Sequence, residues 1–283
     1  MPVVPESILA PIRQEFLALL PYREVSHPLG CHRPRISDAV VFDRLVLALV
    51  SGMGYERVAD TACSTTTIRR RRDEWIEAGV LGHLVLTVLR AYDRMVGLDL
   101  EDLAADGCIT KAPSGGECAG KSPVDRGKRG LKRSQLTDGY GIPVVTVPAG
   151  ANIRDHTLLP ETLDEFAELT EHLDHAPQHP ALSLDAGYDY QLVYTDLAER
   201  EITPRITKRG TKTPIQTDGR WVAERTISWM NNFGKLRRNT ERRRLCTEFY
   251  LALATAIITV RSLIRRAWYT RRWDTRPTSP RIR

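Results

Sequence analysis

The stretch Ala181–Asp189, ALSLDAGYD, decides how the rest of the chain is interpreted. Its apolar half ends at an acid, Asp185, and Gly187 then breaks the pattern. A short apolar run bounded by turn residues is typical of a buried strand, and sheet proteins commonly build sites at the carboxyl ends of such strands. We therefore expect a buried strand over Ala181–Leu184 that carries the Asp185 carboxylate to a sheet edge.

Two further acids, Asp106 and Glu224, lie at positions that suit metal ligands. Asp106, in LEDLAADGCITKAP, also follows an apolar run, and Glu224 lies near the start of RWVAERTISWMNNFGKLRR. At 100° per residue, Glu224 falls on the side of this helix opposite its apolar stripe, with Lys235 and Arg238 further along. A carboxylate at the start of a face that becomes basic suits a metal ligand with phosphate contacts beyond it.

Each of these acids also has a plain structural interpretation. Asp106 and Asp185 can serve as turn or cap residues, and Glu224 is favourable in the first turn of any amphipathic helix, which is the interpretation its spacing alone favours. However, a buried acid at a strand end is costly unless it is paired or metal-bound. Three carboxylates with no nearby His or Cys set favour two Mg²⁺ or Mn²⁺ ions, about 3.5–4 Å apart, over zinc.

The charge of the chain points to a polyanionic partner. The net charge is +6, and Arg225–Arg272 alone carries twelve Lys or Arg against two acids, so the excess is concentrated near the C-terminus. The five cysteines form no CxxC pair, which predicts free thiols in a reducing cytoplasm. We expect no signal peptide and no membrane span, because the longest apolar stretch, Phe249–Val260, is too short to cross a bilayer.

The first 95 residues are expected to be helical and to bind DNA. A helix over Tyr55–Ala62, a turn at Cys63–Ser64 and a second helix from Thr65 to Gly79 outline a helix-turn-helix, and a plain helical hairpin with a solvated arginine run is the alternative. The second helix carries the candidate DNA contacts Arg69, Arg70, Arg71 and Arg72. From Gly97 the pattern changes to alternating strands and helices, and two long helices, Trp221–Arg244 and Leu245–Trp268, are expected to follow.

The loop Gly115–Arg133 contains the pattern GxxxxGK[ST], which nucleotide-binding loops share. Such a loop needs a strand before it and a helix after it, and here prolines and glycines on both sides oppose a helix, so we expect no nucleotide. Its basic residues instead suit a DNA backbone. These are Lys121, Arg126, Lys128, Arg129, Lys132 and Arg133.

Taken together, these stretches resemble the bacterial insertion-sequence transposases of the DDE type, in the group of insertion-sequence families four and five. The resemblance rests on DGCITKAPSGGECAGKSPVDRGKRGLKRS, TDGYGIPVVTVPAGANIRDHTLLPETLD, LDAGYD and RWVAERTISWMNNFGKLRRNTERR, and it covers the chain from about residue 38 to residue 273. It implies an α/β, ribonuclease H-like mixed sheet flanked by helices. The expected domains are a helix-turn-helix-like domain over 1–95, a catalytic domain over 96–272 and a basic, disordered tail over 273–283.

The resemblance also implies roles for individual residues. Asp106, Asp185 and Glu224 match the acidic triad, and Arg220 matches the arginine that precedes the glutamate in the family's C-terminal signature. Thr217 and Asn231 depart from the tyrosine and lysine common in that signature. Lys235, one turn beyond Asn231, is expected to take over the lysine's role.

The implied reaction is metal-assisted cleavage at the terminal inverted repeats of an insertion sequence, followed by attack of the freed 3′-hydroxyl on target DNA. Two ends must meet in one complex, so a homodimer on DNA is expected. Two alternatives stay open: a metal-dependent DNA nuclease without strand transfer, and a non-catalytic DNA-binding repressor.

Overall fold

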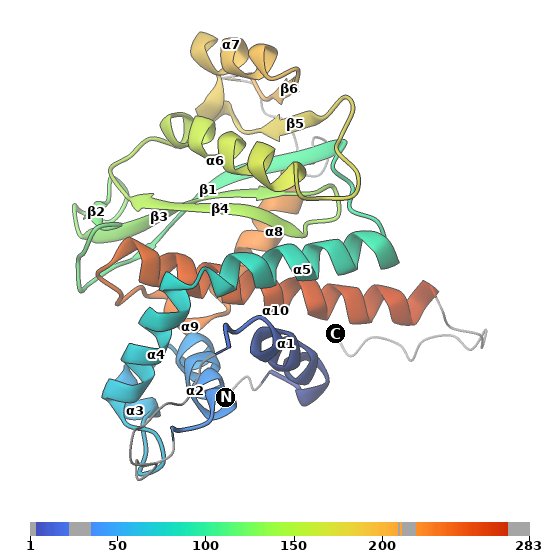
Figure 1. The fold of residues 1–283 in the computed structure, drawn as a ribbon. Helices are drawn as coiled ribbons and strands as arrows, with labels where there is room; N and C mark the ends of the chain where they lie inside the picture. The colour runs from blue at the N-terminus through green and yellow to red at the C-terminus, as the bar shows by residue number, and fades with distance from the viewer. Residues whose placement is uncertain (1–3, 23–34, 209, 211–218, 271–283) are drawn as a thin grey trace, which may run out of the picture.

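A computed structural model describes residues 4–22, 35–208, 210 and 219–270, and Figure 1 shows a group of helices beneath a mixed sheet. Ser64 caps α4 by accepting a hydrogen bond from the Thr67 backbone N–H, and Gly52 ends α2 in the left-handed conformation that glycine adopts readily. The N-terminal helices are α1 (Glu6–Ala18), α2 (Asp38–Ser51), α3 (Tyr55–Val58), α4 (Thr65–Glu77) and α5 (Val80–Met95).

The sheet combines an antiparallel half with a parallel half. β1 pairs with β3 and β3 with both β2 and β4, all antiparallel, whereas β5 pairs with β1 and β6 with β5, both parallel. This arrangement of antiparallel strands β1 to β4 followed by the parallel strands β5 and β6 is ribonuclease H-like, as expected. The strands are β1 (Asp102–Lys111), β2 (Gly120–Lys121), β3 (Arg129–Thr137), β4 (Pro143–Gly150), β5 (Ala181–Leu184) and β6 (Thr203–Ile206).

Helices cover both faces of the sheet. In Figure 1, α6 lies on one side of the sheet, and α5 and α10 lie on the other. The parallel strands require crossover connections, and α6 and α7 supply them. The remaining helical elements are α6 (Asp155–Thr170), the 3₁₀ turn η1 (Ala186–Tyr188), α7 (Gln191–Glu199), α8 (Arg220–Asn231), α9 (Gly234–Arg237) and α10 (Arg244–Thr270).

The helical core draws on both ends of the chain. Buried apolar residues of α1, α2, α4 and α5 form one cluster with those of α10, so the helical group includes a helix from beyond the expected boundary at residue 95. α10 is long and apolar enough to cross a membrane, but two thirds of its apolar window is buried inside the fold, where it packs along α5. It is therefore the core helix that its central apolar stretch predicted.

Two predicted helices are shorter than expected. The single helix predicted over Trp221–Arg244 is broken after Asn231, because Phe233 is extended and Gly234 packs directly against the backbone of Ser51. The helix predicted over Tyr55–Ala62 ends at Val58, because the following residues form a turn in which an aspartate carboxylate accepts backbone N–H groups. The loop predicted up to Arg133 already becomes β3 at Arg129. Residues 273–283, predicted as a basic tail, lie outside the described residues.

Candidate active site

The register between β1 and β5 brings two of the predicted acids side by side. Ala104 pairs with Ser183 across the parallel ladder. Asp106 lies two residues further along β1, and Asp185 lies two residues after Ser183, one residue past the end of β5. Continuation of the register by two residues would bring the two acids level, and neighbouring strands lie about 4.8 Å apart. Because the side-chain direction alternates with period two, both carboxylates project from the same face of the sheet.

The third acid, Glu224, lies on a helix packed against that same face. α8 is tied to the sheet at its far end, where Asn231 bonds with Arg133 of β3 and with the Cys108 Sγ, which is on the Asp106 face of β1. Near its start, Thr226 Oγ1 donates to the Gly141 carbonyl at 2.6 Å. The side chain of Glu224 is exposed, one turn into α8.

The pKa of Asp106 depends on the charges of the neighbouring acids. The pKa of Asp106 is raised to about 7, chiefly by burial and additionally by the negative charges of Asp185, Glu224 and Asp155, against a lowering by the Gly107 N–H bond at 2.7 Å. Asp155 lies on the opposite face of the sheet and is already paired with a lysine at 2.9 Å. Asp185 and Glu224 therefore both place negative charge near the Asp106 carboxyl group.

The donor set fits hard divalent cations. Among the described residues, no three His, Cys, Asp or Glu side chains are close enough to hold an ion as they stand. Asp106 and Asp185 nevertheless share one face, and the long, exposed side chain of Glu224 is free to approach them. Carboxylate oxygens are the ligands that Mg²⁺ and Mn²⁺ prefer, and a cation would favour the ionised form of Asp106, whose pKa is raised by burial and by the neighbouring acids.

Most of the predicted DNA contacts reach solvent. Arg69 and Arg70 are exposed on α4, where they pair with Glu56 at 2.7 Å and Glu74 at 3.8 Å. Arg220 is half-buried at the start of α8. The other exposed members of the predicted set are Lys121, Arg126, Lys128, Arg129 and Arg238.

Arg71 and Arg72 correct that prediction for α4. Arg71 is fully buried, where it pairs with Asp38 and donates to the Ile36 carbonyl at 3.0 Å. Arg72 is 6% exposed and binds Glu241 at 3.1 Å. Both arginines face inward because α4 is packed on two sides, so their guanidinium groups hold the helices together and do not reach a DNA backbone.

Lys132 and Arg133 are also buried, because the predicted loop is in fact a central strand. Lys132 pairs with Asp155 at 2.9 Å on one face of β3. Arg133 faces α8, where it is 2% exposed and two of its guanidinium nitrogens have no hydrogen-bond partner among the described residues. Alternation along β3 sends these two cations to opposite faces of the sheet, and neither meets solvent.

Lys235 does not replace the lysine absent at Asn231. It is 2% exposed, and its Nζ lies 2.7 Å from Glu241 and 4.9 Å from the centre of the Tyr55 ring. The break in the helix after Asn231 turns Lys235 away from the acidic face. Its ion pair is structural.

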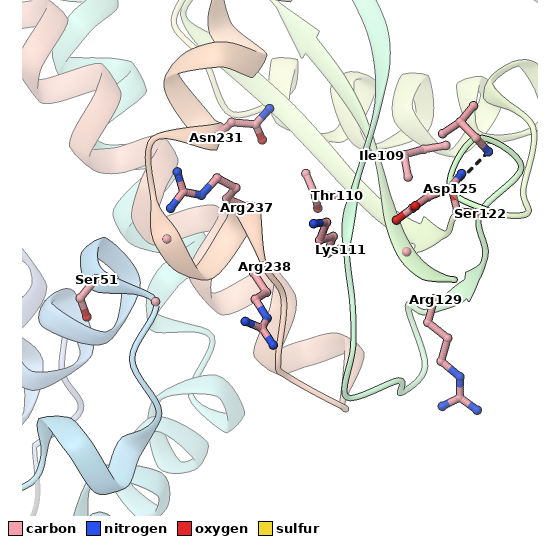
Figure 2. A pocket seen from close by; sticks show the side chains of 14 residues that line it. Ser51, Ile109, Thr110, Lys111, Ser122, Asp125, Arg129, Asn231, Arg237 and Arg238 are labelled. Carbon is pink, nitrogen blue, oxygen red and sulfur yellow. Dashed lines mark hydrogen bonds between the residues drawn. The ribbon is translucent and has the colours of Figure 1, made fainter. Parts of the chain in front are cut away.

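The structure also reveals two cations that the sequence did not single out. Lys111 ends β1 and Arg237 lies in α9, and both are exposed in a groove of about 730 Å³ that Arg129 and Arg238 also line (Figure 2). No periodicity connects residue 111 to residue 237. Only the fold brings them together.

The chain was compared with known proteins. Residues 99–259, which include Asp106, Asp185 and Glu224, match the family described as the transposase DDE domain. A Burkholderia cepacia protein assigned as the transposase of insertion sequence element IS402 is 34% identical over 148 residues, which are 52% of this chain and 70% of the relative. A piggyBac transposase synaptic complex with hairpin DNA aligns with a TM-score of 0.43 and 11% identity, over 96% of this chain and 74% of that chain. A Mos1 mariner paired-end complex with Mn aligns with a TM-score of 0.33 and 11% identity, over 94% of this chain and 86% of that chain.

Proposed function

Because the chain belongs to the DDE transposase family, we propose that Asp106, Asp185 and Glu224 form its metal-binding catalytic triad and that the protein cuts and joins DNA. The observation that supports this proposal is the β1–β5 register, whose last pair, Ala104 and Ser183, stands two residues before Asp106 and Asp185. Family membership makes the chain a transposase. The cleavage and joining steps at terminal inverted repeats are our inference.

Each residue of the triad has a defined task in this proposal. Asp106, Asp185 and Glu224 would hold divalent cations, Mg²⁺ or Mn²⁺, the two aspartates from the sheet and Glu224 from α8. When bound, the cations supply the positive charge that activates the attacking oxygen and stabilises the leaving oxygen. Asp106 is held within β1 and Asp185 directly after β5, while the exposed Glu224 would adjust to the ions.

The proposed reaction has two phosphoryl transfers. In the first, a water oxygen attacks the phosphorus at the element's end and the bond to the 3′-oxygen breaks, which leaves a 3′-hydroxyl and a 5′-phosphate. In the second, that 3′-hydroxyl attacks a target phosphorus, and the target strand's own 3′-oxygen leaves with a proton. Neither step forms a covalent bond to the protein. We also propose that two copies of the chain act together, because two ends must be joined.

The test uses purified protein, Mg²⁺ and a supercoiled plasmid that carries the element's ends. Excised and joined products are expected. Nicks alone would indicate a nuclease, and DNA binding without cleavage would indicate a repressor. Asp185→Asn and Glu224→Gln should abolish cleavage and leave DNA binding largely intact.

A matched control is Asp102→Asn, which removes an acid from the same strand. Asp102 is half-exposed and paired with Arg205 at 2.6 Å, so this variant should cleave like the wild type. Cleavage that survives Asp185→Asn or Glu224→Gln would refute the ligand assignment.

A further inference from the structure

We propose that the groove between α2, the end of β1 and α9 is a binding site for the DNA phosphodiester backbone, built around Lys111 and Arg238. This inference deepens the proposed function, because it names where the DNA lies beyond the acidic triad. Figure 2 shows Arg237 and Arg238 on one side of the groove, Lys111 and Thr110 on the strand in its middle, and Arg129 beyond.

The central observation is a like-charged pair held together by the backbone. Lys111 and Arg238 form an isolated parallel β-bridge, and the Asn239 N–H donates to the Lys111 carbonyl at 2.8 Å. A bridge sets two side chains next to each other, and like charges directly opposite are destabilising. Both side chains are exposed, and neither has a carboxylate partner among the described residues. A bound phosphate would turn this repulsion into attraction.

The rest of the groove supports an anionic ligand. Arg237 and Arg129 are exposed along its walls, and they also lack an acidic partner within the described ranges. Asp125 is the acid in the lining, and Lys128 lies 3.8 Å from it. Thr110 also lines the groove, and its buried Oγ1 has no hydrogen-bond partner among the described residues. Four cations and an unused hydroxyl against one acid favour a polyanion with several phosphates.

The position of the groove relative to the triad favours DNA over a small anion. Lys111 and Asp106 lie on the same strand, five residues or about 17 Å apart at 3.3 Å per residue. At about 3.4 Å per base-pair step, this separation corresponds to about five steps of a duplex, a length that one bound DNA easily spans. The opposite wall, at Ser51 and Gly52, comes from the N-terminal helical group, so a bound duplex would contact both parts of the fold.

The test measures binding of a 30-base-pair duplex of arbitrary sequence in EDTA, so that cleavage plays no part. The double variant Lys111→Ala/Arg238→Ala should bind at least tenfold more weakly at about 100 mM salt. The slope of log K against log salt should fall in magnitude by about two, because each phosphate that a cation neutralises adds roughly 0.9 to it. Arg94→Ala, which removes an exposed arginine paired with Asp174 at 2.7 Å, is the matched control and should change neither quantity.

The outcomes separate this inference from the proposed function. An unchanged salt slope in the double variant would overturn the groove assignment even if the wild type cleaves element ends. Weaker DNA binding by the variant would support the groove even if the wild type fails to cleave. Inorganic phosphate that displaces the duplex at constant ionic strength would identify a free-anion site and overturn the DNA assignment. Single Lys111→Ala should unfold at or above the wild-type temperature, because it removes a repulsion, and this excludes misfolding as the cause of weaker binding.

Discussion

Removal of the Glu241 carboxylate should destabilise the protein more than removal of any surface charge. Glu241 is 8% exposed and lies 2.7 Å from Lys235, 3.1 Å from Arg72 and 2.9 Å from the Tyr55 hydroxyl. Tyr250 extends this network through a 2.9 Å bond to Tyr55. The cluster thus joins α3, α4, α9 and α10, and one carboxylate neutralises two buried cations.

The expected magnitude follows from those contacts. Glu241→Gln keeps the shape of the side chain but leaves Lys235 without its acid in a buried site. Removal of one partner of a buried ion pair costs about 3–5 kcal/mol, because the other charge stays buried and uncompensated. For a domain of this size each kcal/mol corresponds to about 2–4 °C, so the melting temperature should fall by roughly 6–20 °C.

Guanidinium unfolding followed by circular dichroism measures this effect. Lys235→Met in the Glu241→Gln background should recover part of the stability, because removal of both partners leaves fewer charges unpaired. Asp174→Asn breaks an exposed ion pair and should leave the unfolding midpoint unchanged. A Glu241→Gln protein within about 1 kcal/mol of the wild type would refute the claim that this carboxylate joins the helical group to the core.

Three further predictions test other parts of the structure. Gly52→Ala should cost more stability than Gly79→Ala. Both glycines have positive φ, which costs a side chain about 1–2 kcal/mol, but a Cβ at Gly52 would also lie 2.8 Å from the Gly234 carbonyl carbon, whereas nothing lies within 4 Å at Gly79. Equal effects of the two substitutions in urea unfolding would contradict this steric clash. Burial raises the pKa of Asp138 to about 6 from 3.8, so the folded state favours the protonated acid and loses stability as the pH rises between these values. The free energy of unfolding of Asp138→Asn should therefore gain about 3 kcal/mol relative to that of the wild type between pH 3.5 and pH 6.5. A difference in free energy that stays constant over this range would count against the pKa shift. In EDTA, Asp185→Asn should melt at or above the wild-type temperature, because it removes a charge that opposes ionisation of Asp106. Added Mn²⁺ should raise the melting temperature of the wild type alone. A rise in the melting temperature of the variant with Mn²⁺ would contradict the proposed metal site.

The fold class and the acids of the candidate site could be predicted from local patterns. A short apolar run that ends in Asp185 is a buried strand whatever surrounds it, and the α/β order of elements follows from such runs and the helical stretches between them. The expectation that no helix follows the GxxxxGK[ST] pattern was also confirmed, since Pro123 and the glycines after it lead into β3.

The burial of the cations could not be read from the chain. Arg72, Lys132 and Lys235 look like solvated charges in sequence, because burial depends on what a distant segment places against a side chain. Arg72 is 169 residues from its partner Glu241, and Lys132 is 23 residues from its partner Asp155. Lys235 is 6 residues from Glu241, which the break after α9 brings back toward it.

The sequence by itself determined the strands, most of the helices and the acids proposed as metal ligands, because these patterns depend on neighbours a few residues apart. Tertiary structure alone decided that Lys111 stands beside Arg238 and that Ala104, two residues before Asp106, pairs with Ser183, two residues before Asp185. Both pairings depend on strand register, and register is set by the packing of the whole sheet and its helices. The division between cations available to DNA and cations that stabilise the core was decided in the same way.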